Sequence, residues 1–115
     1  MTNANLFDPF DLHGLKLPNR ILMSAMTRTR ATEDDVPTDL IGEYYVQRAS
    51  AGLIVTECTQ VSDQGHGIIR APGIHRPDQI AAWRKVTDAV HAAGGAHLQS
   101  DLALRARGSP RHARR

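Results

Sequence analysis

Several features that would assign the sequence to a secreted or membrane class are missing. It has one cysteine, Cys58, in 115 residues, so no disulfide can form within the chain, which agrees with a reducing compartment. No apolar run approaches the length of about 20 residues that a membrane-spanning helix needs. Residues 1–5 are polar and lack the basic and apolar regions of a signal peptide. These absences predict a soluble, cytoplasmic protein with no membrane partner.

Motifs for phosphate, metal or nucleophilic chemistry are also missing. The sequence contains no Walker-type phosphate loop, no GxGxxG and no nucleophile elbow, so a Rossmann site and a Ser24–Glu57–His triad lack support. Six histidines and one cysteine show no zinc-ligand spacing, and we expect no metal. Cys58 follows an apolar run, where it could contact a ligand or be a small buried side chain.

Positive charge is concentrated at one end of the chain. Residues 1–99 carry nine Lys or Arg against eleven Asp or Glu, whereas residues 100–115 carry five Arg against one Asp. The net charge of +2 therefore comes from the tail and not from the body. A basic arm that binds nucleic acid through its phosphates is one interpretation of such a tail.

The most informative stretch is residues 18–30. Pro18 and Asn19 mark a turn, residues 21–26 form a short apolar run, and hydroxyl-bearing and basic residues follow from Thr27 onward. This order is typical of a buried parallel strand whose carboxyl end opens into a polar site. A plain core strand followed by a solvated basic loop is the alternative.

The rest of the chain alternates between strand-like and helix-like patterns. We expect a hairpin over 6–19 with His13-Gly14 at its turn, and strands over 21–26, 53–61 and 96–99. We expect one helix capped by Thr38 and ended by Gly52. A second begins at Pro77 and ends at Gly94-Gly95, and its apolar face comprises Ile80, Trp83, Val86, Thr87 and Val90.

This element order predicts an α/β protein built from right-handed strand–helix–strand units around a parallel sheet. In a (β/α)8 barrel made of such units, the chemistry lies at the carboxyl ends of the strands. A complete barrel needs about 250 residues. The sequence therefore predicts an incomplete part of one: a hairpin, then strand, helix, strand, helix and strand.

A series of motifs occurs in order along residues 6–99. They are Leu6-Phe7-Asp8-Pro9, Leu17-Pro18-Asn19-Arg20-Ile21, Met26-Thr27-Arg28, Pro37-Thr38, Tyr44-Tyr45, Gln47-Arg48-Ala49-Ser50-Ala51-Gly52-Leu53-Ile54, Ala71-Pro72-Gly73-Ile74-His75, Gln79-Ile80, Trp83 and Val86-Thr87-Asp88-Ala89-Val90-His91-Ala92. Together they resemble the N-terminal part of the old yellow enzyme family, which comprises NADH:flavin oxidoreductases and FMN-dependent ene-reductases. The resemblance covers residues 6–99 almost without a gap.

The resemblance implies a TIM barrel that binds FMN, takes reducing equivalents from NAD(P)H and reduces a small activated alkene. It implies FMN contacts from the first-strand motif at Ala25, Met26 and Thr27, with Thr27 donating to a flavin carbonyl oxygen. The family usually has proline at the position of Ala25. It usually has alanine or glycine against the flavin at the position of Cys58, so the resemblance implies that Cys58 also contacts FMN.

Two further site positions follow from the same resemblance. Gln99 matches the glutamine that hydrogen-bonds the flavin at the end of the third strand. Ile68 falls where close relatives carry a substrate-facing aromatic residue. The family's catalytic residues match no position in this chain, so the resemblance assigns none of them here.

The resemblance stops after Gln99, and this divides the chain into two predicted parts. Residues 1–99 would be a fragment of an FMN-binding barrel, and residues 100–115 an out-of-frame, disordered basic tail. Codons compatible with the tail, read one base later, give Ile-Trp-His-Ser-Gly-Arg, which resembles the family's continuation. We therefore expect a frameshift-truncated ene-reductase that is inactive alone. The alternative is a non-enzymatic fragment whose tail binds nucleic acid or a partner chain.

Overall fold

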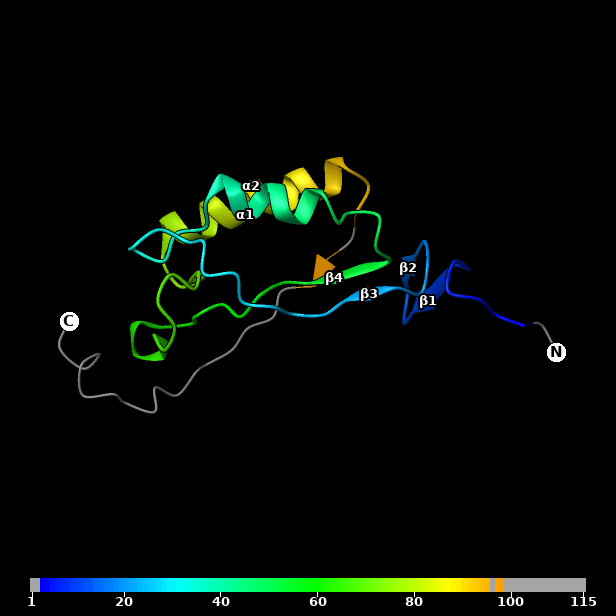
Figure 1. The fold of residues 1–115 in the computed structure, drawn as a ribbon, viewed down its shortest axis with the longest axis horizontal. Helices are drawn as coiled ribbons and strands as arrows, with labels where there is room; N and C mark the ends of the chain where they lie inside the picture. Colours follow the sequence, from blue (N-terminus) through cyan, green and yellow to red (C-terminus); the bar gives the residue numbers. More distant parts are fainter. Residues whose placement is uncertain (1–2, 96, 99–115) are drawn as a thin grey trace.

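The computed structural model describes residues 3–95 and 97–98, which form a small hairpin followed by alternating strands and helices. The elements are β1 (Phe10–Leu12), β2 (Leu15–Leu17), β3 (Leu22–Met23), α1 (Asp39–Val46), β4 (Leu53–Val55), a 3-10 turn (Asp63–Gly65), α2 (Pro77–Ala92) and β5 (His97–Leu98). Figure 1 shows both helices on one side of the parallel strands, with the hairpin beyond one end of them. This order confirms the expected α/β class.

The hairpin has the turn that the sequence indicated. β1 and β2 pair antiparallel with Leu12 opposite Leu15, so His13 and Gly14 form a two-residue turn. Both have positive φ, at 48° and 96°, as a type I′ turn requires. The Asp11 carboxylate accepts the Gly14 N–H at 2.7 Å, which stabilises the turn.

The parallel sheet has the order β3-β4-β5, but its strands are shorter than expected. Ladder pairing joins Leu22 to Leu53 and Met23 to Ile54, whereas strands over 21–26 and 53–61 were expected. After the last paired residues of β3 and β4, the backbone forms hydrogen bonds with groups that do not belong to the sheet. The N–H of Arg28 binds a side-chain carboxylate, and Gln60 pairs with residue 73 of the following loop.

Both helices begin where the sequence indicated, but α1 ends at Val46 and not at Gly52 as expected. Thr38 occupies the N-cap position of α1 but makes no capping hydrogen bond; its hydroxyl donates to the carbonyl of Arg30 at 2.7 Å. On α2, Ile80 is 46% exposed and Gln79 is buried instead, so the expected apolar face was wrong at its first position. Gln79 is buried because its side-chain oxygen accepts the N–H groups of His75 and Arg76.

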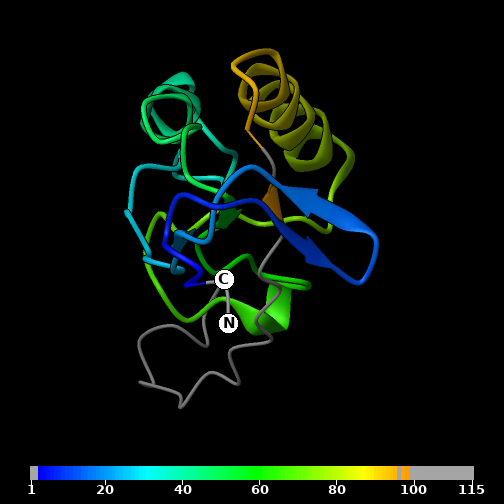
Figure 2. The ribbon, with the colours of Figure 1, turned by 90° about the vertical axis from the view of Figure 1, so that its right-hand side faces the viewer.

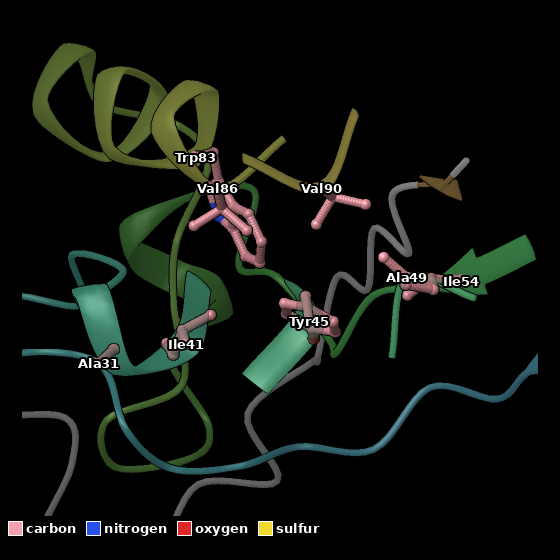
Figure 3. Close-up of a cluster of buried hydrophobic side chains, with 8 residues drawn as sticks. All are labelled: Ala31, Ile41, Tyr45, Ala49, Ile54, Trp83, Val86 and Val90. Carbon is pink, nitrogen blue, oxygen red and sulfur yellow. The ribbon is translucent and has the colours of Figure 1, made fainter. Parts of the chain in front are cut away.

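The core lies between the two helices and the sheet. Figure 2 shows α1 and α2 side by side over the strands, and Figure 3 shows the buried side chains that meet between these layers. The ring centroids of Tyr45 and Trp83 lie 6.4 Å apart, and the Trp83 indole N–H donates to the carbonyl oxygen of Gly73 at 3.1 Å. The cluster comprises Ala31, Ile41, Tyr45, Ala49, Ile54, Trp83, Val86 and Val90.

The amino end of the sheet is held by close backbone packing. Gly52 donates to the carbonyl of Ile21 at 2.8 Å, and the Asn19 side chain donates to Ser50 O at 2.9 Å. A Cβ at position 52 would collide with the carbonyl oxygen of Asn19, so glycine is required by this close approach. Across residues 3–95 and 97–98, no helix has the length and apolarity that a membrane crossing demands.

Candidate functional site

The residues expected to contact flavin lie beyond the carboxyl ends of β3 and β4. Ala25, Met26 and Thr27 follow β3, and Cys58 follows β4. Met26 is 50% exposed, Ala25 is exposed, and Thr27 and Cys58 are half-buried. Because carboxyl ends of parallel strands share one edge of a sheet, all four residues belong to the same end of the fold. Gln99, the fifth expected contact, lies outside the described residues.

A hydrogen bond joins the two strand ends. The backbone N–H of Arg28 donates to the Glu57 carboxylate at 3.1 Å. Thr27 immediately precedes this donor, and Cys58 immediately follows this acceptor. The structure therefore brings together the segments that carry the predicted contacts.

Glu57 is itself held by Tyr45 of α1. The Tyr45 hydroxyl donates to the second carboxylate oxygen at 3.2 Å and accepts the N–H of Glu57 at 2.8 Å. Glu57 is 0% exposed and Tyr45 1% exposed. A buried carboxylate is costly unless it is hydrogen-bonded, and here each oxygen has a partner.

Burial dominates the electrostatics of this pair. It raises the pKa of the Glu57 carboxyl above the ordinary value of 4.5, against the opposing hydrogen bonds from Arg28 and Tyr45 and the charge of Arg28. Burial also raises the pKa of the Tyr45 hydroxyl, and the charge of Glu57 raises it further. Tyr45 therefore keeps its proton at neutral pH and remains a donor.

Ile68, the expected substrate-facing residue, lies in the loop after β4. It is half-buried, and its carbonyl accepts the N–H of Ala71 at 3.3 Å. Gln60 holds the same loop, since its side chain donates to Ala71 O at 3.2 Å and its oxygen lies 3.1 Å from His66 Nδ1. Within the described residues, no hydrogen bond joins Ile68 to the expected flavin contacts.

A separate cavity of about 210 Å³ lies between the segment after β3 and α1. The guanidinium groups of Arg28 and Arg48 lie 4.6 and 3.8 Å from the Tyr44 ring centroid, which is cation–π geometry. The residues that line the cavity are Arg28, Arg30, Leu40, Ile41, Glu43, Tyr44 and Gln47. None of the expected flavin contacts lines it.

Sequence reasoning missed the Tyr45–Glu57 pair as a structural centre. A usable signal was present, because Glu57 follows directly on a strand-like apolar run. Glutamate is almost never fully buried unless it is paired. A search for a hydroxyl or cationic partner on the preceding helix would have pointed to Tyr44 and Tyr45, without deciding between the two.

The residues present fit an FMN ring edge. The Thr27 side chain makes no hydrogen bond to any residue in 3–95 or 97–98, so its hydroxyl can donate to a ligand. Met26 offers exposed apolar surface beside it. Cys58 leaves part of its surface open on the neighbouring strand end.

Fold and site together define a class: α/β proteins of the (β/α)8 type, of which the described residues form a part without a closed barrel. Within that class, the chain belongs to the NADH:flavin oxidoreductase / NADH oxidase family, whose model matches residues 5–104. The family resemblance inferred from the sequence is confirmed.

Individual relatives agree with this assignment. The chain is 48% identical over 93 residues to chanoclavine-I aldehyde reductase fgaOx3 of Penicillium roqueforti, covering 79% of this chain and 25% of that protein. It is 40% identical over 90 residues to a probable flavin mononucleotide-dependent alkene reductase of Leishmania infantum, covering 78% and 25%. The chain thus spans about a quarter of the length of these relatives.

A solved structure shows the same arrangement. The old yellow enzyme homologue from Zymomonas mobilis matches with a TM-score of 0.83 at 48% sequence identity, covering 85% of this chain and 28% of that chain. This match confirms the expectation that the chain corresponds to a part of a TIM barrel. The predicted division at residue 99 and the predicted nature of residues 100–115 lie outside the described residues and stay predictions.

Proposed function

We propose that the carboxyl ends of β3 and β4 form part of an FMN site in an NAD(P)H-dependent reductase of small activated alkenes. The observation that supports this most directly is the position of Thr27 in a chain that belongs to this flavin-dependent family. Its hydroxyl lies beyond a strand end and has no hydrogen-bond partner among the described residues. Bound FMN would supply the redox chemistry, which is the transfer of reducing equivalents from a nicotinamide to an activated alkene.

In this proposal, the protein's own residues bind and orient the flavin. Thr27 donates a hydrogen bond to a flavin carbonyl oxygen, and Met26 packs apolar surface against the ring. Ala25 and Cys58 lie against the ring from the two strand ends, Gln99 donates a further hydrogen bond, and Ile68 lines the substrate pocket. No residue of this chain is assigned a catalytic role.

We also propose that the 115-residue chain is inactive by itself. The described residues contain a three-stranded sheet and no closed barrel, so a flavin placed at these strand ends is contacted from only part of its perimeter. Ligand sites typically bury most of the ligand surface. The isolated chain is therefore expected neither to retain FMN nor to oxidise NAD(P)H with an enone.

The test compares the purified chain alone with the chain mixed with the complementary part of the Zymomonas mobilis barrel. We expect visible flavin absorbance and enone-dependent NAD(P)H oxidation only in the mixture, with weaker FMN binding for Thr27→Val. A mixture that binds no FMN would overturn the proposed site. A yellow, monomeric 12.6 kDa chain that turns over alone would overturn the proposed inactivity.

The competing function, nucleic-acid binding, has less support. It depends on the arginines of residues 100–115, which lie outside the described residues. The described part carries nine Lys or Arg against eleven Asp or Glu, so its net charge opposes binding to phosphates. We therefore propose a small molecule, and not nucleic acid, as the partner.

A further inference from the structure

The segment from Ser24 to Arg30 follows β3 directly and lies outside the sheet. Ladder pairing of β3 ends at Met23, and the segment continues past the strand end without regular structure. A segment of this kind needs other contacts to hold a definite position. The hydrogen bond from the Arg28 N–H to the Glu57 carboxylate, at 3.1 Å, is such a contact.

The acceptor of this bond is a rigid one. Glu57 is completely buried, and the Tyr45 hydroxyl contacts both its carboxylate and its backbone N–H, at 3.2 and 2.8 Å. Tyr45 in turn belongs to α1 and packs in the core beside Trp83. The position of the carboxylate is thus set by the core and not by the loop it binds.

Burying a glutamate here is costly, which calls for a structural reason. An apolar residue of similar volume would avoid the desolvation of the carboxylate. An acceptor at this place satisfies the N–H of the half-buried Arg28, and a donor shielded from water without a partner carries its own penalty. The arrangement favours a role in positioning over a role in general stability.

We propose that Glu57 is a positioning residue that sets the place of Thr27 through the backbone of Arg28. The proposal rests on the proposed function, because the position of Thr27 matters for activity only if its hydroxyl contacts the flavin. One hydrogen bond connects the residue after Thr27 with the residue before Cys58. It therefore sets the spacing between two proposed flavin contacts from different strands. A misplacement of about 1 Å at such a contact is enough to weaken binding or catalysis strongly.

The first test uses the full chain without flavin and follows amide hydrogen exchange by NMR. In the wild type, we expect the Arg28 amide to exchange at least about tenfold more slowly than that of Thr29. We also expect its proton shift to follow the titration of Glu57. Glu57→Leu should lose this protection, whereas Glu57→Gln should keep it, because the amide oxygen can still accept the bond.

Amide exchange in the wild type alone can overturn the proposal, so this test does not require that any variant folds. An Arg28 amide that exchanges as fast as Thr29 and ignores the Glu57 titration would contradict the bond. Equal loss of protection in Glu57→Leu and Glu57→Gln would also contradict it, since a hydrogen bond to oxygen would then not be responsible.

The second test adds the complementary barrel part and measures the FMN dissociation constant and visible spectrum. We expect Glu57→Leu to weaken FMN binding about tenfold and to shift the spectrum, with both restored in Glu57→Gln. The control is Gln79→Leu, which removes a buried polar side chain that holds a different loop. An equal effect of the control would overturn the proposal, because general destabilisation would explain both.

The two tests separate this inference from the proposed function. If the wild-type mixture binds no FMN, the proposed function fails, and hydrogen exchange still decides whether Glu57 holds the segment. If FMN binds and Glu57→Leu changes Arg28 exchange but neither affinity nor spectrum, the proposed function stands and the positioning role is wrong.

Discussion

The helix-covered side of the sheet and its β3 edge contain similar apolar residues in opposite environments. Where the helices face the sheet, Ile41 of α1 is 1% exposed and Trp83 of α2 is 3% exposed. At the β3 edge Leu22 is 57% exposed, and Phe7, which precedes the hairpin, is 76% exposed. In Figure 1 the hairpin lies beyond the strands, away from both helices.

The difference shows that apolar character alone does not bury a residue in this chain. Burial follows the two helices, which pack against each other and against the sheet. At the β3 edge, no described strand pairs with the free side of Leu22 and Met23, and exposed strand edges favour association. The helix side should therefore govern the free energy of unfolding, and the β3 edge should govern self-association.

The largest expected effect is on the helix side. Trp83→Ala removes the ring that packs on Tyr45 and the indole donor to Gly73 O. We expect a loss of about 3–5 kcal/mol in the free energy of unfolding, measured by urea titration followed by circular dichroism. Ile80→Ala on the same helix, at a position 46% exposed, is the control and should cost well under half as much. Similar losses would mean that the buried and the exposed face of α2 contribute equally to the free energy of unfolding.

The next effect concerns the β3 edge. Leu22→Lys places a charge on an exposed edge strand and should weaken self-association about tenfold or more, measured by sedimentation velocity. Circular dichroism should stay unchanged. Leu40→Lys, at a position on α1 with a similar exposure of 55%, is the matched control. If both substitutions act equally, general surface hydrophobicity and not the strand edge drives association.

A smaller effect is expected from pH. Because the folded-state pKa of Glu57 lies above its ordinary value of 4.5, the native state binds this proton more tightly than the unfolded state does. The stability that the protonated Glu57 carboxyl contributes is fully present below about pH 4.5 and is lost as pH rises through its folded-state pKa.

The pH effect is measured as a difference between wild type and Glu57→Gln. Relative to that variant, the free energy of unfolding of the wild type should fall with rising pH, by up to about 1.4 kcal/mol per pH unit in the window. Subtracting the free energy of unfolding of the variant at each pH cancels the contributions of the other carboxyl groups. A difference that rises with pH would show that hydrogen bonds outweigh burial at Glu57.

The smallest effect sharpens the comparison by strengthening the helix side. Gly42 lies within α1, and a Cβ there would meet Val86 at an ordinary contact distance of 3.7 Å. Gly42→Ala should therefore raise the free energy of unfolding by about 0.5–1 kcal/mol, measured by thermal and urea unfolding. Gly52→Ala should do the reverse, since its Cβ would collide with the Asn19 carbonyl. Stabilisation by both would contradict this packing.

Much of the architecture could be predicted from local chemistry. His13-Gly14 determined the hairpin turn, Pro77 the start of α2, and the alternation of apolar runs the parallel sheet. Side-chain partners could not be predicted in this way. The hydroxyl of Thr38 was expected to cap α1 and instead binds the carbonyl of Arg30. Ile80 was expected inside, but its neighbour Gln79 is buried because it satisfies two backbone N–H groups.

The candidate site divides in the same manner. Thr27 and Cys58 could be located at strand ends because polar residues follow apolar runs there, and family motifs indicated a flavin contact. The clamp formed by Tyr45, Glu57 and Arg28 required the fold, because its three members come from separate elements. The sequence by itself determined the order of the elements and which segments follow the strands, since turns and periodicity act over a few residues, but not the residues at which β3 and β4 end. Only the tertiary structure decided that a buried carboxylate holds them, since that hydrogen bond joins groups 29 residues apart.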